Sequence, residues 1–153
     1  MVVSQAMKEK VLSLGAEREN VHVIPMGVDL KNKFVLADIP KKKRAILFVG
    51  RLVEKKGLKY LIDAFNELQM KYSDASLVIV GKGPEETNIR QQIFKYQIES
   101  SVKLMGALTH AGLDKIYQLH DIAVFPFIED STGDMEGFGL VMVEAMGDRK
   151  SVV

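Results

Sequence analysis

The sequence has no cysteine among its 153 residues, few prolines, and no long hydrophobic run. Without cysteine, disulfide bonds, zinc sites built on thiolates and thiol nucleophiles are all excluded. The longest nearly apolar run, residues 122–128, has 7 residues. A membrane-spanning helix needs roughly 20, so none is predicted. The N-terminal residues lack the basic start and apolar stretch of a signal peptide, so export is not indicated and a cytoplasmic location is expected.

Hydrophobic residues make up 47% of the chain and charged residues 27%, with a formal net charge of +1. These proportions are typical of one soluble globular domain. A chain of this length buries roughly 68 to 70% of its unfolded surface, which is enough for a core without covalent staples. A second full domain therefore does not fit in the sequence.

Charge is unevenly distributed along the chain. Residues 41–59 contain eight bases and one acid, Glu54, whereas residues 129–136 contain four acids and no base. If the fold brings these segments together, a positive site for an anion would face a cluster of carboxylates. The alternative is two solvated surface patches. For the adjacent bases of residues 41–44 alone, a solvated linker is the expected structure.

The first 43 residues are predicted to form a helix, a strand and a linker. Ser4 precedes apolar residues at helical spacing and Gly15 follows them, which predicts a short capped helix over residues 4–14. Residues 21–24 are predicted to form a short strand. Residues 25–43 contain Pro, Gly, Asp, Asn and a lysine run without a clear period, which predicts a linker.

From residue 44 onward, apolar runs alternate with helical patterns. Strands are predicted at residues 44–49, 76–80, 102–105 and 122–125, with the start of another at 151–153. Helices are predicted between them, at residues 58–68, 85–96, 111–119 and 139–146. Apolar strands that alternate with helices indicate an α/β fold, an open parallel sheet with helices on both faces. Such sheets bind ligands at the carboxyl ends of their strands, so the candidate loops begin at Gly50, Gly81, Gly106 and Pro126.

The loop GRLVEKKG, residues 50–57, follows the first of these strands and opens a helix. Arg51 and Lys56 are five positions apart across this turn, a spacing that lets both side chains reach one anion. Arginine supplies a planar fork of donors and lysine a compact charge, a combination suited to a diphosphate. The loop is not a Walker motif, because the required glycines and the Lys-Ser/Thr pair are missing. A basic helix start in water is the alternative.

The loop VGKGPE places Gly81 and Gly83 directly after a predicted strand. Glycines here serve a tight turn, and they also allow a planar ligand to approach closely. Turn formation is the default interpretation.

The segment GDMEGFGLVMVEAM, residues 133–146, is the most specific pattern in the sequence. Gly137 and Gly139 allow a tight turn ahead of an apolar helix, whose free N–H groups would point into the turn and attract phosphate. Glu136 lies in the turn, and Glu144 lies eight residues later in the helix. Carboxylates beside an anion site could accept hydrogen bonds from sugar hydroxyls. The alternatives are a favourable charge at a helix start for Glu136 and a solvated helix face for Glu144.

Together these motifs resemble the carboxyl-terminal, donor-binding half of GT-B retaining glycosyltransferases, especially family 4. The pair GRLVEKKG and EGFGLVMVE, with its Glu-x7-Glu spacing, carries most of the resemblance. IPMGVDL at residues 24–30 is similar to the family's inter-domain IPNGVD, with Met26 where asparagine is usual. LVIVGKGPE, LMGAL and YQLHDIAVFPF also match in kind and order, so the resemblance covers nearly the whole chain.

The resemblance implies a nucleotide-diphosphate sugar as donor, an acceptor that stays unknown, and transfer with retention of configuration. Arg51 and Lys56 would hold the diphosphate and Glu136 would approach the donor sugar, and these three are the expected catalytic residues. Glu144 would bind the ribose hydroxyls. The expected donor-binding residues are Arg51, Lys56, Gly81, Ala107, Leu108, Glu136, Gly137, Phe138, Gly139, Leu140 and Glu144. Of these, Ala107 and Leu108 would lie near the base.

The family needs no metal, so the resemblance implies neither a metal nor another cofactor, and Asp130 and Asp134 are interpreted as solvated loop acids. No histidine is assigned to catalysis, because the family's catalytic histidine and acceptor site lie in the amino-terminal domain. The implied division is a remnant of that domain over residues 1–24, an inter-domain linker over 25–43, and the donor-binding domain over 44–153. Nucleic acid is not an expected partner. Peripheral membrane contact by the full-length enzyme stays open.

The end of the sequence, MGDRKSVV, departs from the family pattern, in which small residues and proline are usual and further helices follow. We therefore expect a fragment of a longer enzyme, truncated at its end, that binds a donor but transfers no sugar alone. Two alternatives remain. One is half of a sugar-nucleotide epimerase on a related fold, and the other is a non-catalytic module that binds nucleic acid or anionic lipid through residues 41–59.

Overall fold

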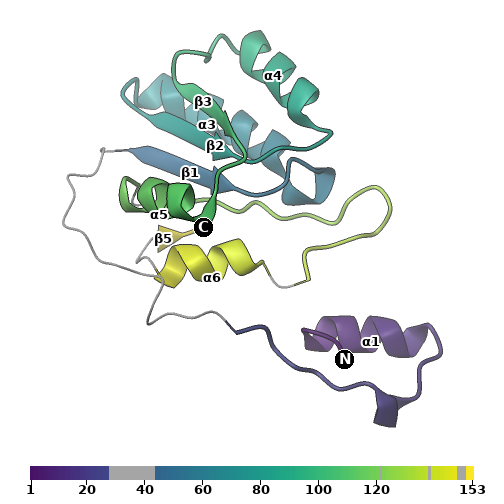
Figure 1. Ribbon diagram of the computed structural model, residues 1–153. Helices are drawn as coiled ribbons and strands as arrows, with labels where there is room; N and C mark the ends of the chain where they lie inside the picture. Colours follow the sequence, from purple (N-terminus) through teal and green to yellow (C-terminus); the bar gives the residue numbers. More distant parts are fainter. Residues whose placement is uncertain (28–43, 121, 138, 148–150) are drawn as a thin grey trace.

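The computed structural model of the chain describes residues 1–27, 44–120, 122–137, 139–147 and 151–153. Its centre is a five-stranded sheet in the order β3-β2-β1-β4-β5 (Figure 1). The strands are β1 (Ala45–Val49), β2 (Ser76–Val80), β3 (Val102–Gly106), β4 (Ile122–Ala123) and β5 (Ser151–Val152). Every pairing between these strands is parallel. The predicted α/β fold with an open parallel sheet is confirmed.

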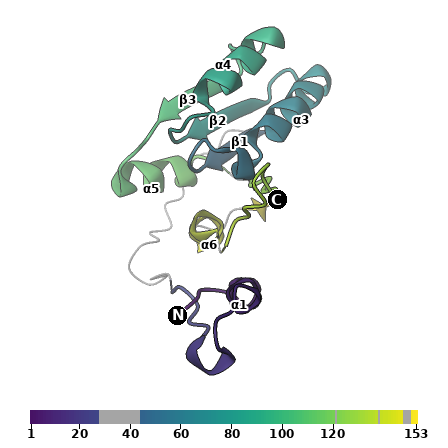
Figure 2. The same ribbon diagram turned by 90° about the vertical axis from the view of Figure 1, so that its right-hand side faces the viewer.

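Helices connect the strands and cover both faces of the sheet (Figure 2). One face carries α3 (Leu58–Lys71) and α4 (Glu86–Lys95), and the other carries α5 (His110–Gln118) and α6 (Leu140–Gly147). A single 3-10 turn, η2 (Glu54–Lys56), leads into α3. The four helices begin and end within three residues of the predicted bounds. In α3, α4 and α5 the apolar positions follow a 3.6-residue period, whereas α6 is apolar at nearly every position.

Alternate residues of the strands enter two separate hydrophobic cores. Phe48, Leu77 and Ile79 pack with α3 and α4. Leu47 and Val49 pack with α5 and α6 on the opposite face. All five residues of β1 are buried, so a run without polar residues is what this central position requires. Full burial of each large side chain stabilises the fold by about 1.5–3 kcal/mol.

The N-terminal segment lies apart from the sheet, beside α6 (Figure 1). Its helix α1 (Gln5–Ser13) is capped as predicted, since the Ser4 hydroxyl accepts a hydrogen bond from Met7 N at 3.2 Å. A short 3-10 turn, η1 (Arg18–Asn20), follows it. None of the residues of α1 is buried. Within the described parts of the chain, no helix combines the length and apolar character that crossing a membrane requires.

Two predictions of strands need correction. Residues 21–24 form no strand: Val23 makes only an isolated parallel bridge with Val2, and one bridge is not a ladder. The strand predicted over 122–125 is shorter, because β4 ends at Ala123. The backbone nevertheless stays bonded to its neighbours, with Phe125 N donating to Val153 O at 2.8 Å. Most of the predicted linker, residues 28–43, lies outside the described residues.

One edge of the sheet is β3, which pairs only with β2 among the described strands. Its first residue, Val102, is buried, while Lys103 beside it is exposed. The other edge is β5, with two residues. The strands β1, β2 and β3 have five residues each, whereas β4 and β5 have two each.

The loops that follow β1 and β2 are in close backbone contact. Gly50 N donates to Val80 O, and Leu52 N donates to Lys82 O, both at 3.0 Å. Gly81 has a positive φ of 144°, and a Cβ atom there would lie 1.8 Å from Gly50 O. A glycine is therefore required at position 81 by the fold itself.

We predict that Gly81→Ala destabilises the protein by about 3 kcal/mol, because a methyl group would overlap backbone that cannot move aside. Gly106→Ala is the matched control: Gly106 also has a positive φ, 69°, but a Cβ there would meet only the flexible Lys82 side chain at 3.5 Å. It should cost about 1 kcal/mol. Urea unfolding measures both values, and equal losses would contradict the role of the backbone overlap.

Candidate functional site

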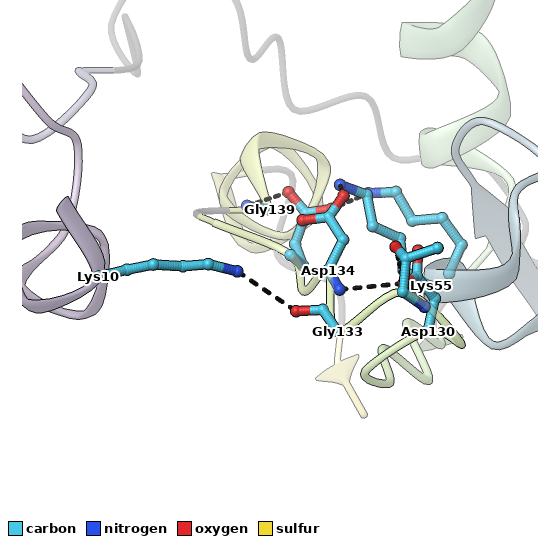
Figure 3. Close-up of polar contacts among 9 residues, drawn as sticks. Lys10, Lys55, Asp130, Gly133, Asp134 and Gly139 are labelled. Carbon is cyan, nitrogen blue, oxygen red and sulfur yellow. Dashed lines mark hydrogen bonds and ion pairs between the residues drawn. The ribbon is translucent and has the colours of Figure 1, made fainter. Parts of the chain in front are cut away.

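The basic and acidic segments lie against each other at the carboxyl end of the sheet (Figure 3). Lys55 Nζ lies 2.7 Å from Asp134 Oδ2, and Lys56 Nζ lies 2.5 Å from Glu136 Oε2. These two pairs join residues about 80 positions apart in the sequence. The charge clusters of residues 54–56 and 130–136 therefore form one site, not two separate surface patches.

The sheet order explains why these segments meet. β1 and β4 are parallel neighbours, so the loops that leave their carboxyl ends start side by side. Ile128 N donates a hydrogen bond to Lys55 O at 3.0 Å. Gly57 has φ +64°, and a Cβ atom there would lie 1.7 Å from Pro126 O. The backbones of residues 55–57 and 126–128 are thus fixed against each other.

The pair formed by Lys56 and Glu136 is the centre of the site. The two side chains are only 12% and 21% exposed. Besides Lys56, Glu136 accepts a hydrogen bond from Gly139 N at 3.0 Å, directly before α6 begins. Lys56 Nζ also lies 4.4 Å from the centre of the Phe127 ring. A lysine and a helix-start amide therefore converge on one negative group, an arrangement that suits an anion.

Asp130 holds the acidic loop in shape. Its Oδ1 accepts hydrogen bonds from Thr132 Oγ1 at 2.7 Å and from the amides of Thr132 and Asp134 at 2.9 Å. The hydroxyl bond in particular lowers the pKa of Asp130 below 3.8. The hydrogen bond from Lys55 likewise lowers the pKa of Asp134, and it raises the pKa of Lys55. Both acids are on the surface of the loop, with the Asp134 side chain 55% exposed, and the hydrogen bonds to Asp130 and the ion pair of Asp134 also hold the loop in shape.

Arg51 stands apart from this network. Its side chain is exposed, and within the described residues it forms no hydrogen bond or ion pair. The structure therefore brings Lys56 together with Glu136 and Gly139 but does not join Arg51 to them. The guanidinium is available to an incoming ligand.

The other predicted residues lie on the surrounding elements. Glu144 is partly buried on α6, and Leu140 is 37% exposed at the start of that helix. Gly137 lies near α1, since a Cβ atom on it would be 3.6 Å from Met7 Sδ. Phe138 lies outside the described residues.

The loop after β3 is a separate part of this edge. Ala107 is exposed, while Leu108 packs against the core under α5 and α6. Gly81 lies in the neighbouring loop, in contact with Gly50. The hydrogen bonds recorded for the described residues do not connect these positions to Lys56 or Glu136. They flank the charged centre and do not form part of it.

Three contacts of the site are not foreseeable from the motifs. Phe127 lies under Lys56, and Ser131 Oγ donates to Glu54 Oε2 at 2.7 Å. Lys10 Nζ of α1 donates to Gly133 O at 3.3 Å (Figure 3). For the first, the sequence places Phe127 in a loop after a strand, but it does not indicate the contact with Lys56. The other two depend on tertiary placement alone.

A cavity of about 300 Å³ lies beside the Lys56–Glu136 pair. Its lining includes Phe127, Met135, Glu136, Gly137 and Met142. Among the described residues, no group of three or more histidines and acids is placed to hold a metal ion. The site thus combines the Lys56–Glu136 pair with a small cavity that has acidic and apolar walls.

Comparison with known proteins finds a family and several relatives. The model of the family "Glycosyl transferases group 1" matches residues 31–153. The amylovoran biosynthesis glycosyltransferase AmsK of Erwinia amylovora is 30% identical over 145 residues, which cover 94% of this chain and 36% of that protein. The phosphatidyl-myo-inositol mannosyltransferase of Mycobacterium tuberculosis is 31% identical over 134 residues, covering 85% of this chain and 33% of that protein. The chain thus spans about a third of the length of these relatives.

A solved structure supports the fold. Anabaena Alr3699/HepE, crystallised with UDP and glucose, superposes with a TM-score of 0.82 at 24% identity. The match covers 99% of this chain and 42% of that one. At this level of identity the likeness shows the arrangement of helices and strands.

We predict that Thr132→Val raises the pKa of Asp130 toward its ordinary value of 3.8, because the hydroxyl bond is the largest cause of its lowering. A carboxyl whose pKa is lowered by folding stabilises the protein above its unfolded pKa, and this contribution is lost as the pH falls through the folded pKa. The stability difference between the variant and the wild type should therefore be complete at neutral pH and shrink below 3.8. NMR titration of the Asp130 carboxyl, with Thr87→Val as a surface control, measures the shift. An unchanged pKa would contradict it.

Proposed function

Because this chain belongs to the family of group 1 glycosyltransferases, we propose that it is the donor-binding part of a retaining GT-B enzyme of family 4. Its substrate is a nucleotide-diphosphate sugar, and the whole enzyme transfers the sugar to an acceptor. The acceptor pocket belongs to the rest of that enzyme. The chain alone binds the donor and does not transfer it.

One observation carries this proposal: Glu136 lies between the Lys56 ammonium and the amide that begins α6. A carboxylate in this place has the same two partners that a phosphate oxygen would have. A diphosphate that enters can replace it. We assign Arg51 as a further donor to that ligand, because its exposed guanidinium has no partner among the described residues.

The proposed mechanism is electrostatic. As the bond to the sugar breaks, negative charge grows on the leaving diphosphate, and Arg51, Lys56 and the amides of residues 137–139 stabilise it. One preorganised donor of this kind contributes about 2.7–4 kcal/mol to lowering a barrier. Neither a metal ion nor another cofactor is part of this mechanism. Arg51 and Lys56 supply the positive charge that would otherwise have to come from a cation bound to the diphosphate.

The carboxylates have separate roles in the proposal. Glu136, on the wall of the 300 Å³ cavity, turns from Lys56 to the hydroxyls of the donor sugar. Glu144, one turn into α6, accepts hydrogen bonds from the ribose hydroxyls. Gly81, Ala107, Leu108 and Leu140 form the walls around the nucleoside. The structurally similar Anabaena protein was crystallised with UDP and glucose, which supports a nucleotide and a sugar as the kind of ligand proposed for this enzyme.

We further place residues 1–24 with the amino-terminal domain, residues 25–43 in the connection between domains, and residues 44–153 in the donor-binding domain. The enzyme works in the cytoplasm. Contact with a membrane surface belongs to the remainder of the enzyme, as does the acceptor.

A thermal-shift panel with uridine, guanosine and adenosine diphosphates tests the function, since a ligand bound only by the folded state raises its stability. We expect one of these nucleotides to stabilise the chain. Lys56→Ala should weaken its binding at least about tenfold, through loss of a charged hydrogen bond, and Arg51→Lys about threefold to tenfold, through loss of the fork.

The matched control for this panel is Lys59→Ala, which removes an exposed base of the same segment from the groove between α3 and α4. An equal loss in the control, with steep salt dependence and no preference for diphosphates, would indicate a general polyanion-binding module instead.

Substitutions of the two glutamates should change the binding of different ligands. Glu136→Gln is expected to strengthen binding of the bare nucleoside diphosphate, because Lys56 is released and a repulsive charge removed, while it weakens the preference for the nucleotide-sugar. Glu144→Ala should weaken the binding of ribonucleotides more than the binding of their deoxyribose analogues. Calorimetry with these ligands decides the point, and equal changes for all of them would contradict the assigned contacts.

A further inference from the structure

We propose that Phe127 is a positioning residue of this site: its ring holds the Lys56 ammonium in place for the donor diphosphate. This inference rests on the proposed function and adds a residue to it. Phe127 is uncharged and has no hydrogen-bond donor to offer a diphosphate, so the role assigned to it here is to position Lys56.

The geometry is that of a cation–π contact. Lys56 Nζ lies 4.4 Å from the centre of the Phe127 ring, within the roughly 6 Å over which the face of a ring attracts a cation. The contact is strengthened by limited solvent access, because the Lys56 side chain is 12% exposed. The ammonium therefore has an aromatic partner in addition to its carboxylate partner.

The backbone fixes the two residues beside each other. On one side, Ile128 N donates to Lys55 O at 3.0 Å. On the other, Gly57 packs so closely on Pro126 O that no side chain could stand between them. Residues 56 and 127 are the central residues of these two short segments. Their separation is thus set by two backbone contacts and not by the side chains alone.

The ring itself is held from the core of the protein. Phe127 lies 5.9 Å from Phe125, centre to centre, and Phe125 lies 6.5 Å from Phe48. Phe48 is fully buried in β1, and Phe125 is 6% exposed. Tilted ring pairs at these distances attract each other beyond their burial. The position of the ring is therefore anchored to the central strand.

The same ring touches the turn that holds the counterion of Lys56. A Cβ atom on Gly139 would lie 3.0 Å from Phe127 Cε2, so the glycine backbone packs directly on the ring. Gly139 N is the donor to Glu136. Phe127 thus lies against both the ammonium and the start of α6, the two groups that the diphosphate would use.

This arrangement matters when a ligand enters. A lysine side chain has four flexible bonds, and fixing it costs up to about 2 kcal/mol of conformational entropy. When the diphosphate replaces Glu136, the ring still holds the ammonium. The Lys56 side chain is therefore already ordered before binding, and little further conformational entropy is lost. A preorganised donor of this kind improves affinity without a new contact to the ligand.

The first experiment detects the contact without any ligand. In NMR spectra of the full chain, the Lys56 Hε protons should be shifted upfield by the Phe127 ring current. Phe127→Leu should abolish the shift and Phe127→Tyr should retain it. Phe94→Leu, which removes a 73% exposed ring on α4, is the matched control and should leave it unchanged. Absence of the shift in the wild type would overturn the proposal.

The second experiment is a double-mutant cycle read by calorimetry with uridine, guanosine and adenosine diphosphates. Phe127→Leu is expected to weaken the nucleotide that binds by about threefold to tenfold, and Phe127→Tyr should restore it. In the Lys56→Met background Phe127→Leu should not lower the nucleotide affinity further, because the ammonium that the ring positions is absent. An equal loss in both backgrounds would show a general structural effect and would overturn the proposal.

The two arms separate this inference from the proposed function. If the wild type binds none of the nucleotides, the proposed function fails, and the NMR arm alone decides whether Phe127 positions Lys56. If nucleotides bind and the cycle shows no coupling, the proposed function stands and the role of Phe127 is overturned.

Discussion

Burial of β1 on both faces is the constraint from which the rest of the structure follows. All five of its residues are buried, with parallel neighbours on each side. Parallel neighbours require helical crossovers, and these helices supply the two layers that cover the sheet. The same geometry collects the carboxyl ends of the strands at one edge. Lys55 and Lys56 can therefore meet Asp134 and Glu136 only because β1 lies beside β4.

Local periodicity is enough to predict most of the fold. The apolar runs of β1 and β2 and the helical stripe of α3 are properties of neighbouring residues, so the sequence alone reveals them. Strand ladders are different, because they need a partner elsewhere in the chain. Residues 21–24 have the composition of a strand, yet only Val23 finds a bridge, with Val2. The length of β4 is equally hard to predict, because it is set by how many of its residues pair with β1 and β5, which is two.

The site is predictable in its components but not in its pairing. The motifs around Lys56 and Glu136 identify a base and an acid near an anion site. They cannot reveal that the two residues bond to each other, nor that Lys55 takes Asp134 instead. Which of two adjacent lysines pairs with a given acid depends on the direction of each side chain, and only the tertiary structure determines that direction. Phe127 is a clearer case, because a phenylalanine after a strand usually indicates core packing and here also contacts a charged group.

The edge strand β3 also bears on how copies of this chain behave toward one another. Among the described strands β3 has a single neighbour, β2, and an edge strand of this kind is the usual template for intermolecular sheet growth and aggregation. Lys103 projects from β3 as an exposed residue. An antiparallel or parallel copy docking along this edge would bring two ammonium groups close together on one sheet, at an electrostatic cost. An exposed lysine on an edge strand is therefore a feature that disfavours pairing of this edge with a second copy.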